Sequence, residues 1–349
     1  FKGSKIASHY VQPHIGGDLA LLWGIAKAVN KLDAMDKDYL QRHCNDVEDW
    51  EQAIETITWE EIETKSGVPR SEIENIAEVY AQSKKSIFAW TMGITHHAHG
   101  VQNVQAVANL ALCRGMVGKS GCGLMPIRGH SNVQGIGSVG VTPKLKTQIF
   151  DALQSKYEVK LPTTVGKDTL ECMEAASRYE LGFGFSLGGN LYGSNPDSKF
   201  AAEALSRLDM NVMLSTTMNT GHVNGLAAET YILPVLARDE ESTPTTQESM
   251  FNYVRLSDGG PRRVPGPRSE VEVIAELGNR LLPDADGIDW KEMQQTSTIR
   301  QWIADVVPGY DKIADIEQTR KEFQIGGRTF HEPKFSTTDG RANLHTHAI

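Results

Sequence analysis

The chain has 349 residues, of which 40% are apolar and 23% charged, and this composition is typical of a globular protein and excludes a disordered, collagen-like or coiled-coil one. The 44 acidic against 35 basic residues give a net charge of −9. This charge argues against a nucleic-acid-binding protein, because such proteins normally present a basic face to phosphates. No apolar run reaches the roughly 18 to 20 residues of a membrane-spanning helix, so we expect no membrane span.

Cysteine usage predicts a reducing compartment. Cys44, Cys113, Cys122 and Cys172 are widely spaced and form no C-x-x-C pair, so that neither a zinc site nor a disulfide framework is indicated. We therefore expect a cytoplasmic protein. Because the sequence begins at Phe1 and ends in a polar tail, residues 336–349, we also expect a fragment of a longer polypeptide.

In the first half, apolar residues at helical spacing predict a helix over 19–32. The Asp18 carboxylate can accept hydrogen bonds from the N–H groups of its first turn. Capping boxes at 58–61 and 71–74 predict the starts of two short helices. A strand is predicted over 86–90 and a helix from about Val101, before a Gly-rich stretch.

The second half alternates predicted strands with a helix. The strands cover 181–187, 211–217 and 231–235, and the helix covers 197–208. Alternation at this spacing is typical of βαβ units and a parallel sheet. The irregular stretch near 130–145 and the length favour two α/β lobes, which we place at 1–140 and 141–335, followed by the polar tail.

The ends of the predicted strands are the candidate ligand sites, because ligands of parallel sheets bind outside the strand carboxyl ends. The first such end, 92–100, carries His96, His97 and His99. A metal site is one interpretation. However, neighbouring histidines point in different directions and no carboxylate or cysteine lies nearby in the sequence, so we predict no metal ligands here and favour hydrogen bonding to a ligand or a structural loop.

The second end is the Gly-rich stretch 118–140. Lys119 and Ser120 follow a glycine, but the spacing of a phosphate-binding P-loop fails. Residues 135–140 match G-x-G-x-x-G, yet Pro143 stands where the helix of a nicotinamide-binding fold would be running. What remains is a run of polar side chains among glycines, in which Arg128 is either a solvated surface charge or part of a ligand site.

The third and fourth ends, 187–197 and 215–222, combine glycines with asparagine, serine and threonine. Each can be ordinary turn chemistry. Taken together, they favour an extended nucleotide-like ligand, because several loops would then bind several polar groups.

At these motifs the sequence resembles the formate-dehydrogenase-like molybdopterin oxidoreductases of the dimethyl sulfoxide reductase superfamily. The resemblance lies in 16–22, 92–100, 126–135, 187–193 and 229–234, and the run Pro-Ile-Arg-Gly-His-Ser-Asn-Val-Gln-Gly at 126–135 is the most specific. It implies two Rossmann-like, three-layer αβα lobes with mostly parallel sheets. It also implies molybdenum held by two molybdopterin guanine dinucleotides.

The resemblance further implies roles for individual residues. Arg128 occupies the place of an arginine beside the metal, where its guanidinium can hold a formate-sized carboxylate. His130, where well-studied formate dehydrogenases carry Gln, becomes a hydrogen-bonding or proton-transfer partner. The implied cofactor-binding residues are Gly93, His96, Gly129, Asn132, Gly188, Gly189, Asn190, Thr216, Thr217, Asn219 and His222.

Two parts of the family pattern fall outside this sequence. The iron–sulfur cysteines and the molybdenum-binding cysteine or selenocysteine would precede Phe1, and the C-terminal β-barrel would follow Ile349. We therefore expect the chain alone to be inactive. The full enzyme would oxidise a small substrate such as formate by two electrons and pass them through an iron–sulfur cluster to an electron-transfer partner. The alternative is a non-catalytic nucleotide-binding α/β module acting as a sensor or assembly partner.

Overall fold

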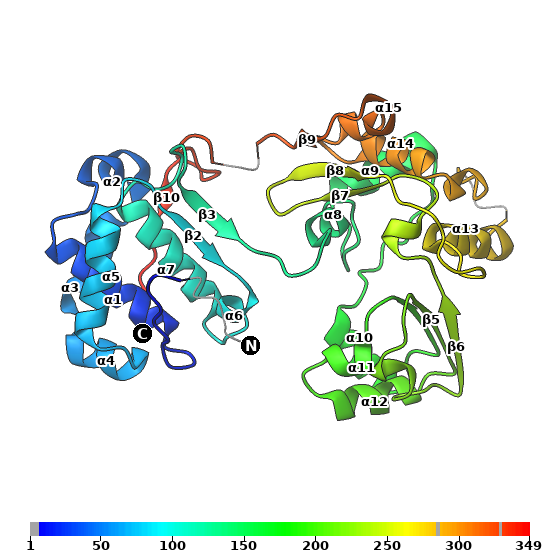
Figure 1. Ribbon diagram of the computed structural model, residues 1–349, viewed down its shortest axis with the longest axis horizontal. Coiled ribbons are helices and arrows are strands. Elements are labelled where there is room, and N and C mark those ends of the chain that lie inside the picture. The colour runs from blue at the N-terminus through cyan, green and yellow to red at the C-terminus, as the bar shows by residue number, and fades with distance from the viewer. Residues whose placement is uncertain (1–6, 284–286, 328–329) are drawn as a thin grey trace. The chain divides into compact units, whose positions relative to one another are not determined.

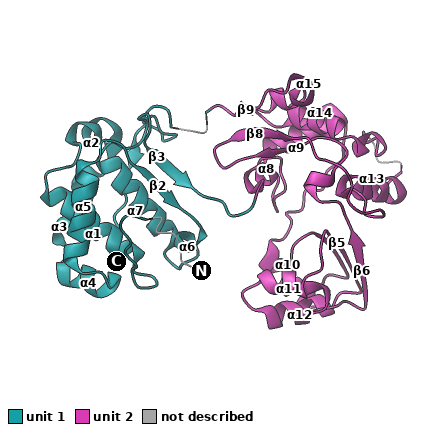
Figure 2. Cartoon of the chain, in the orientation of Figure 1, with its two compact units in different colours: residues 1–130, 327–349 teal, residues 131–326 magenta. Residues whose placement is uncertain are grey.

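A computed structural model describes residues 7–283, 287–327 and 330–349, and the chain divides into two compact units (Figure 2). Unit 1 comprises residues 1–130 and 327–349, and unit 2 comprises residues 131–326. The sequence placed the boundary at residue 140 and a separate tail from residue 336. The observed division differs because the chain leaves unit 1 after His130 and its last residues return to pack in unit 1.

Unit 1 consists mainly of helices, together with two short pairs of parallel strands (Figure 1). Strand β2 pairs with β3, and β1 pairs with β10. The helices are α1 (Asp18–Lys31), α2 (Lys37–His43), α3 (Val47–Thr56), α4 (Trp59–Ser66), α5 (Arg70–Gln82), α6 (Met92–Thr95) and α7 (Gly100–Cys113). The strands are β1 (Cys44–Asn45), β2 (Ile87–Trp90), β3 (Gly123–Pro126) and β10 (Ala342–Asn343).

Helix α1 lies at the centre of unit 1 and packs against α3, α4, α5 and α7. Its buried Trp23 and Val29 belong to one apolar core that also contains Trp50 and Ile73. A Cβ at Gly24 would lie 2.8 Å from the Ile62 side chain, so glycine at this position permits the close approach of α1 and α4.

The C-terminal segment is part of this core. Cys44 pairs with Ala342 in the parallel register of β1 and β10, and the Leu344 N–H donates to the Asn45 carbonyl at 3.2 Å. The Leu344 side chain is buried in the core of unit 1. Residues that the sequence assigned to a polar tail therefore complete the first unit.

Unit 2 contains two three-stranded sheets. One has the order β4–β5–β6 and is parallel, and the other has the order β7–β8–β9 and is antiparallel. The helices are α8 (Val133–Ser138), α9 (Thr147–Tyr157), α10 (Thr169–Ser177), α11 (Leu191–Ser194), α12 (Ser198–Ser206), α13 (Glu270–Leu281), α14 (Thr296–Val306) and α15 (Ile316–Thr319), with 3₁₀ turns η1 (Thr220–His222), η2 (Arg238–Glu240), η3 (Glu292–Gln294) and η4 (Asp311–Ile313). The strands are β4 (Phe183–Leu187), β5 (Met210–Ser215), β6 (Glu229–Pro234), β7 (Thr245–Glu248), β8 (Tyr253–Ser257) and β9 (Phe323–Gln324).

Each sheet of unit 2 lies beside its own apolar cluster. Met173 of α10 packs with Ala201 and Leu205 of α12, and these helices accompany the parallel sheet. Val254 of β8 packs with Tyr310 in the cluster beside the antiparallel sheet. The predicted α/β class with mostly parallel sheets is confirmed, as are the strand–helix–strand–strand order over 181–235 and the helix over 19–32.

Two predicted helix caps are wrong. Gly17, and not Asp18, occupies the cap position of α1, and the Asp18 side chain makes no cap hydrogen bond. Helix α5 begins at Arg70 after Pro69, so Ser71 lies inside it. The Arg70 N–H instead donates to Glu63 Oε1 at 2.6 Å. The cap at Thr58 is confirmed, since its hydroxyl accepts from the Glu61 N–H at 3.2 Å. Within the described ranges, no helix has both the length and the apolar character needed to cross a membrane.

Candidate functional site

The carboxyl ends of β2 and β3 form a polar edge in unit 1. The two strands are parallel, with Trp90 opposite Pro126, and the Ile127 N–H donates to the Trp90 carbonyl at 2.7 Å. The segments that follow the strands therefore leave from the same edge. A Cβ at Gly129 would lie 3.5 Å from Met92 Cε, which shows that the two segments are in contact.

Five of the predicted site residues lie on these two segments. Gly93 lies in the one-turn helix α6. His96 caps the end of that helix, where its N–H donates a hydrogen bond to the Met92 carbonyl. Arg128, Gly129 and His130 follow β3, and all five residues are exposed. In the part of the chain that the structure describes, the Arg128 guanidinium forms no hydrogen bond or ion pair with a protein group. It is therefore available to an anion.

An open cavity of about 440 Å³ lies at the same edge. It is lined by the start of α1 and by the segment after β2, which bring Asp18 and His97 together, with His97 Nε2 3.9 Å from Asp18 Oδ2. Neither residue is among the site residues predicted from the sequence. Of the two neighbouring histidines, His96 is exposed, whereas His97 is half-buried beside Asp18 of α1.

The second polar edge lies in unit 2, at the carboxyl ends of β4 and β5. Gly188 and Gly189 follow β4 with φ of +65° and +77°, a backbone region that favours glycine. The Gly188 N–H donates to the Leu214 carbonyl at 2.7 Å, which joins the turn to the end of β5. Apart from the adjoining residues of the chain, no atom of the described residues lies within 4 Å of a Cβ built at either glycine, so the turn presents an open backbone surface.

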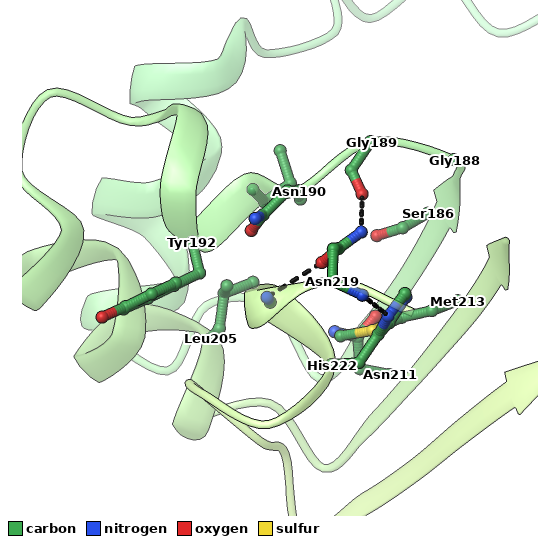
Figure 3. Close-up of a pocket in the computed structure, with 12 residues that line it drawn as sticks. Ser186, Gly188, Gly189, Asn190, Tyr192, Leu205, Asn211, Met213, Asn219 and His222 are labelled. Atoms are coloured by element: carbon green, nitrogen blue, oxygen red, sulfur yellow. Dashed lines mark hydrogen bonds between the residues drawn. The ribbon is translucent and has the colours of Figure 1, made fainter. Parts of the chain in front are cut away.

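Two asparagines join this glycine turn to the segment after β5, and Figure 3 shows the hydrogen bond between Asn219 and Gly189. Asn190 Nδ2 donates to Thr220 Oγ1 at 2.8 Å, and Asn219 Nδ2 donates to the Gly189 carbonyl at 2.9 Å. A Cβ at Gly221 would lie 2.5 Å from Asn190 Oδ1, so glycine is needed where the segments meet. We call this pair of cross-links the asparagine clasp.

Each asparagine of the clasp also holds its own segment. Asn190 Oδ1 accepts from the Gly193 N–H at 2.8 Å and caps α11. Asn219 Oδ1 accepts from the Gly221 N–H, and the Asn219 N–H donates to His222 Nδ1, both at 2.9 Å. The His222 ring is only 5% exposed. These side chains are thus engaged with protein groups, whereas Thr216 and Thr217 are exposed.

Asn132 belongs to neither edge. It begins α8 in unit 2 with φ of +62°, and its Oδ1 accepts from the Glu248 N–H at 3.0 Å. The structure therefore brings the other predicted site residues together in two groups, one in each unit. Among the described residues, no group of three or more His, Cys, Asp or Glu side chains is arranged to hold a metal ion.

Comparison with known proteins gives a consistent family. Residues 3–240 match the family model for molybdopterin oxidoreductase. An uncharacterized oxidoreductase of Mycobacterium tuberculosis is 30% identical, over 98% of this chain and 46% of its own length. Protein YdeP of Escherichia coli is 32% identical, over 98% and 47%. A Staphylococcus aureus protein named "Putative formate dehydrogenase" is 27% identical, over 97% and 35%.

Among solved structures, acetylene hydratase from Pelobacter acetylenicus has a TM-score of 0.66 and 15% sequence identity, over 97% of this chain and 49% of that chain. This likeness shows a shared fold. The chain spans about half or less of the length of these relatives. The match of the family model over 3–240 covers more than half of the chain, and the chain therefore belongs to the molybdopterin oxidoreductase family.

Proposed function

We propose that a polypeptide containing this chain is a molybdenum-dependent, formate-dehydrogenase-like oxidoreductase that binds two molybdopterin guanine dinucleotides. Family membership supports molybdopterin as the cofactor. The observation that carries the proposal is the placement of the predicted residues at strand carboxyl ends, the position at which α/β sheets bind nucleotides. The name of the Staphylococcus aureus relative supports formate over other small substrates.

The polar edge of unit 2 fits a dinucleotide. The turn at Gly188 and Gly189 leaves room for a pyrophosphate to approach the backbone, and the exposed hydroxyls of Thr216 and Thr217 offer donors to a ribose or a base. Because Asn190, Asn219 and His222 bond to protein groups, we assign them to holding the two segments in place. The structure thus supports direct ligand contact at four of the seven predicted residues at this edge.

The polar edge of unit 1 fits a small anionic substrate. An arginine guanidinium can form two parallel hydrogen bonds with a carboxylate, and Arg128 has its donors unengaged among the described residues. We assign to Arg128 the orientation of formate, and to His130 a hydrogen bond or a proton transfer at the same place. When bound, the molybdenum cofactor supplies a centre that accepts two electrons from the substrate.

The remaining parts of the proposal lie outside this chain. The relatives are longer than this chain. By resemblance, the additional part would supply the molybdenum-binding cysteine or selenocysteine and an iron–sulfur cluster that carries electrons to a partner. We infer that the 349-residue chain alone does not turn over formate. The four unpaired cysteines support a reducing, cytoplasmic location.

The test uses a polypeptide that contains this chain and is as long as its relatives. It is assayed with formate and an artificial electron acceptor, and its molybdenum content is measured. Formate-dependent acceptor reduction by molybdenum-loaded protein is expected. Loaded protein that is inert toward formate would overturn the substrate assignment. Protein that binds a guanine nucleotide without metal would instead support the non-catalytic nucleotide-binding module.

A further inference from the structure

A buried amide in the parallel sheet of unit 2 lacks protein partners. Asn211 lies in β5 and is 1% exposed, and among the described residues neither its Oδ1 nor its Nδ2 has a hydrogen-bond partner. Burying an unpaired amide costs roughly 1–3 kcal/mol by protein mutational data. The side chain is therefore placed where a partner from outside the chain would stabilise the fold.

The neighbouring strands leave space for that amide. Asn211 stands opposite Gly184 of β4 and Thr230 of β6 in the parallel register. A Cβ at Gly184 would lie 2.9 Å from Asn211 Oδ1, so a larger residue would press on the amide. Thr230 Oγ1 is also buried and has no hydrogen-bond partner among the residues that the structure describes. Two strands in succession thus present unpaired polar groups to the same side of the sheet.

Asn211 also lines a small pocket of about 20 Å³ (Figure 3). The volume exceeds the roughly 10–15 Å³ that one water molecule requires and is far below that of a nucleotide base. Ser186 and His222 line the same pocket and offer further polar groups. Since His222 Nδ1 accepts from the Asn219 N–H, the neutral ring carries its proton on Nε2, which is then a donor.

We propose that this pocket is a binding site for a single buried water molecule, held by the side-chain amide of Asn211. The water satisfies polar groups that the strands leave unpaired, and buried waters typically make two to four such hydrogen bonds. Residues of β5 and His222 both line the site. His222 Nδ1 accepts the hydrogen bond from the N–H of the clasp residue Asn219. The water therefore supports the asparagine clasp from inside the unit.

The direct test is NMR of the ¹⁵N-labelled chain without added ligand. We expect magnetisation transfer from a long-lived water to the Asn211 side-chain amide in the wild-type protein, and a water within hydrogen-bond distance of that amide in a high-resolution crystal structure. The transfer should be lost in Asn211→Leu. An Asn211 amide that exchanges no magnetisation with water, in a dry pocket, overturns the proposal.

Thermal unfolding gives a second, independent readout. Leucine has the same branching and the same number of side-chain heavy atoms as asparagine, so Asn211→Leu removes the amide without opening a large cavity. If a water satisfies Asn211, the unfolding midpoint of Asn211→Leu stays level or falls. If the amide is unsatisfied, its removal raises the midpoint, and that rise contradicts the proposal. Should Asn211→Leu not fold, the NMR measurement on the wild-type protein still decides between the two outcomes.

Discussion

At the scale of single residues, the chemistry proposed for unit 1 depends on an arginine without a protein partner. Other arginines form ion pairs or donate hydrogen bonds to backbone carbonyls. Arg42 pairs with Asp38, and Arg114 donates to the Ala34 carbonyl. Arg128 follows a strand end and forms neither contact among the described residues. A free guanidinium at this position can bind a carboxylate without first breaking an existing ion pair.

Replacement of this arginine tests its role. In the polypeptide at its relatives' length, Arg128→Ala should lower kcat/KM for formate by roughly 10²-fold or more, because orientation of the substrate is lost. Molybdenum content should stay nearly unchanged. Arg128→Lys should recover little, since an ammonium cannot form the paired hydrogen bonds. The matched control is Arg42→Ala, an exposed arginine on α2 that should leave turnover as it was.

The cysteines give a prediction on thiol reactivity. Burial raises the pKa of the Cys113 thiol to about 12 and that of Cys44 to about 11. Cys122 and Cys172 are half-buried. A thiol reagent at pH 8 should therefore modify Cys122 and Cys172 before unfolding and Cys44 and Cys113 only afterwards, which peptide mass spectrometry can resolve.

The same pKa shift has a consequence for stability. A thiol whose pKa is higher in the folded state than in the unfolded state stabilises the folded protein. This contribution is fully present at pH values below the unfolded-state pKa of about 8.5 and is lost as the pH rises toward the folded-state pKa. Stability should thus decline from pH 8.5 upward, and Cys113→Ala should weaken that decline. A decline of equal steepness in Cys113→Ala would show that other groups cause it.

At the scale of elements, the asparagine clasp joins the segments after β4 and β5. Each of its two cross-links is one hydrogen bond, so Asn219→Ala should cost about 1 kcal/mol of local stability. Amide exchange over 187–193 and 215–222 should become about fivefold faster, while exchange in α1 stays the same. Asn30→Ala, which removes an exposed hydrogen bond to Glu55 in unit 1, is the matched control. Unchanged exchange in both segments would show that the clasp carries no stability.

The elements also show which features could be predicted from the sequence. The strands and helix over 181–235 could be predicted because period and turn residues are local signals. The cap of α5 could not, because the donor and acceptor that replace Ser71 come from Arg70 and Glu63, seven positions apart. The partial burial of His97 likewise depends on its position beside Asp18 of α1, which a local sequence pattern does not predict.

The local structure of the candidate site was predictable to the same degree. Gly188 and Gly189 were identifiable because a turn with positive φ requires glycine at such positions. The roles of Asn190 and Asn219 were not, because a sequence shows that an amide is present without showing what it bonds to. Their engagement with protein groups emerged only when the segments after β4 and β5 were placed together.

At the scale of the whole molecule, the chain closes unit 1 with residues from both ends of the sequence. Leu344 is 3% exposed in the core formed by the first half of the chain. Leu344→Ala should therefore destabilise unit 1 by about 2–4 kcal/mol. Hydrogen exchange followed by mass spectrometry should show faster exchange in α1 and α7 and no change in unit 2. Equal acceleration in both units would contradict the division of the chain at residues 130 and 327.

We propose that the glycine turn of unit 2 takes part in binding a molybdenum cofactor that carries guanine dinucleotides. The most direct measurement is the content of molybdenum and of GMP released by acid hydrolysis, made on the purified polypeptide at its relatives' length. We expect one molybdenum and two GMP per polypeptide, with loss of GMP when Gly188 and Gly189 are both replaced by valine. Folded protein that carries neither molybdenum nor GMP, after expression in cells that make the cofactor, would contradict it.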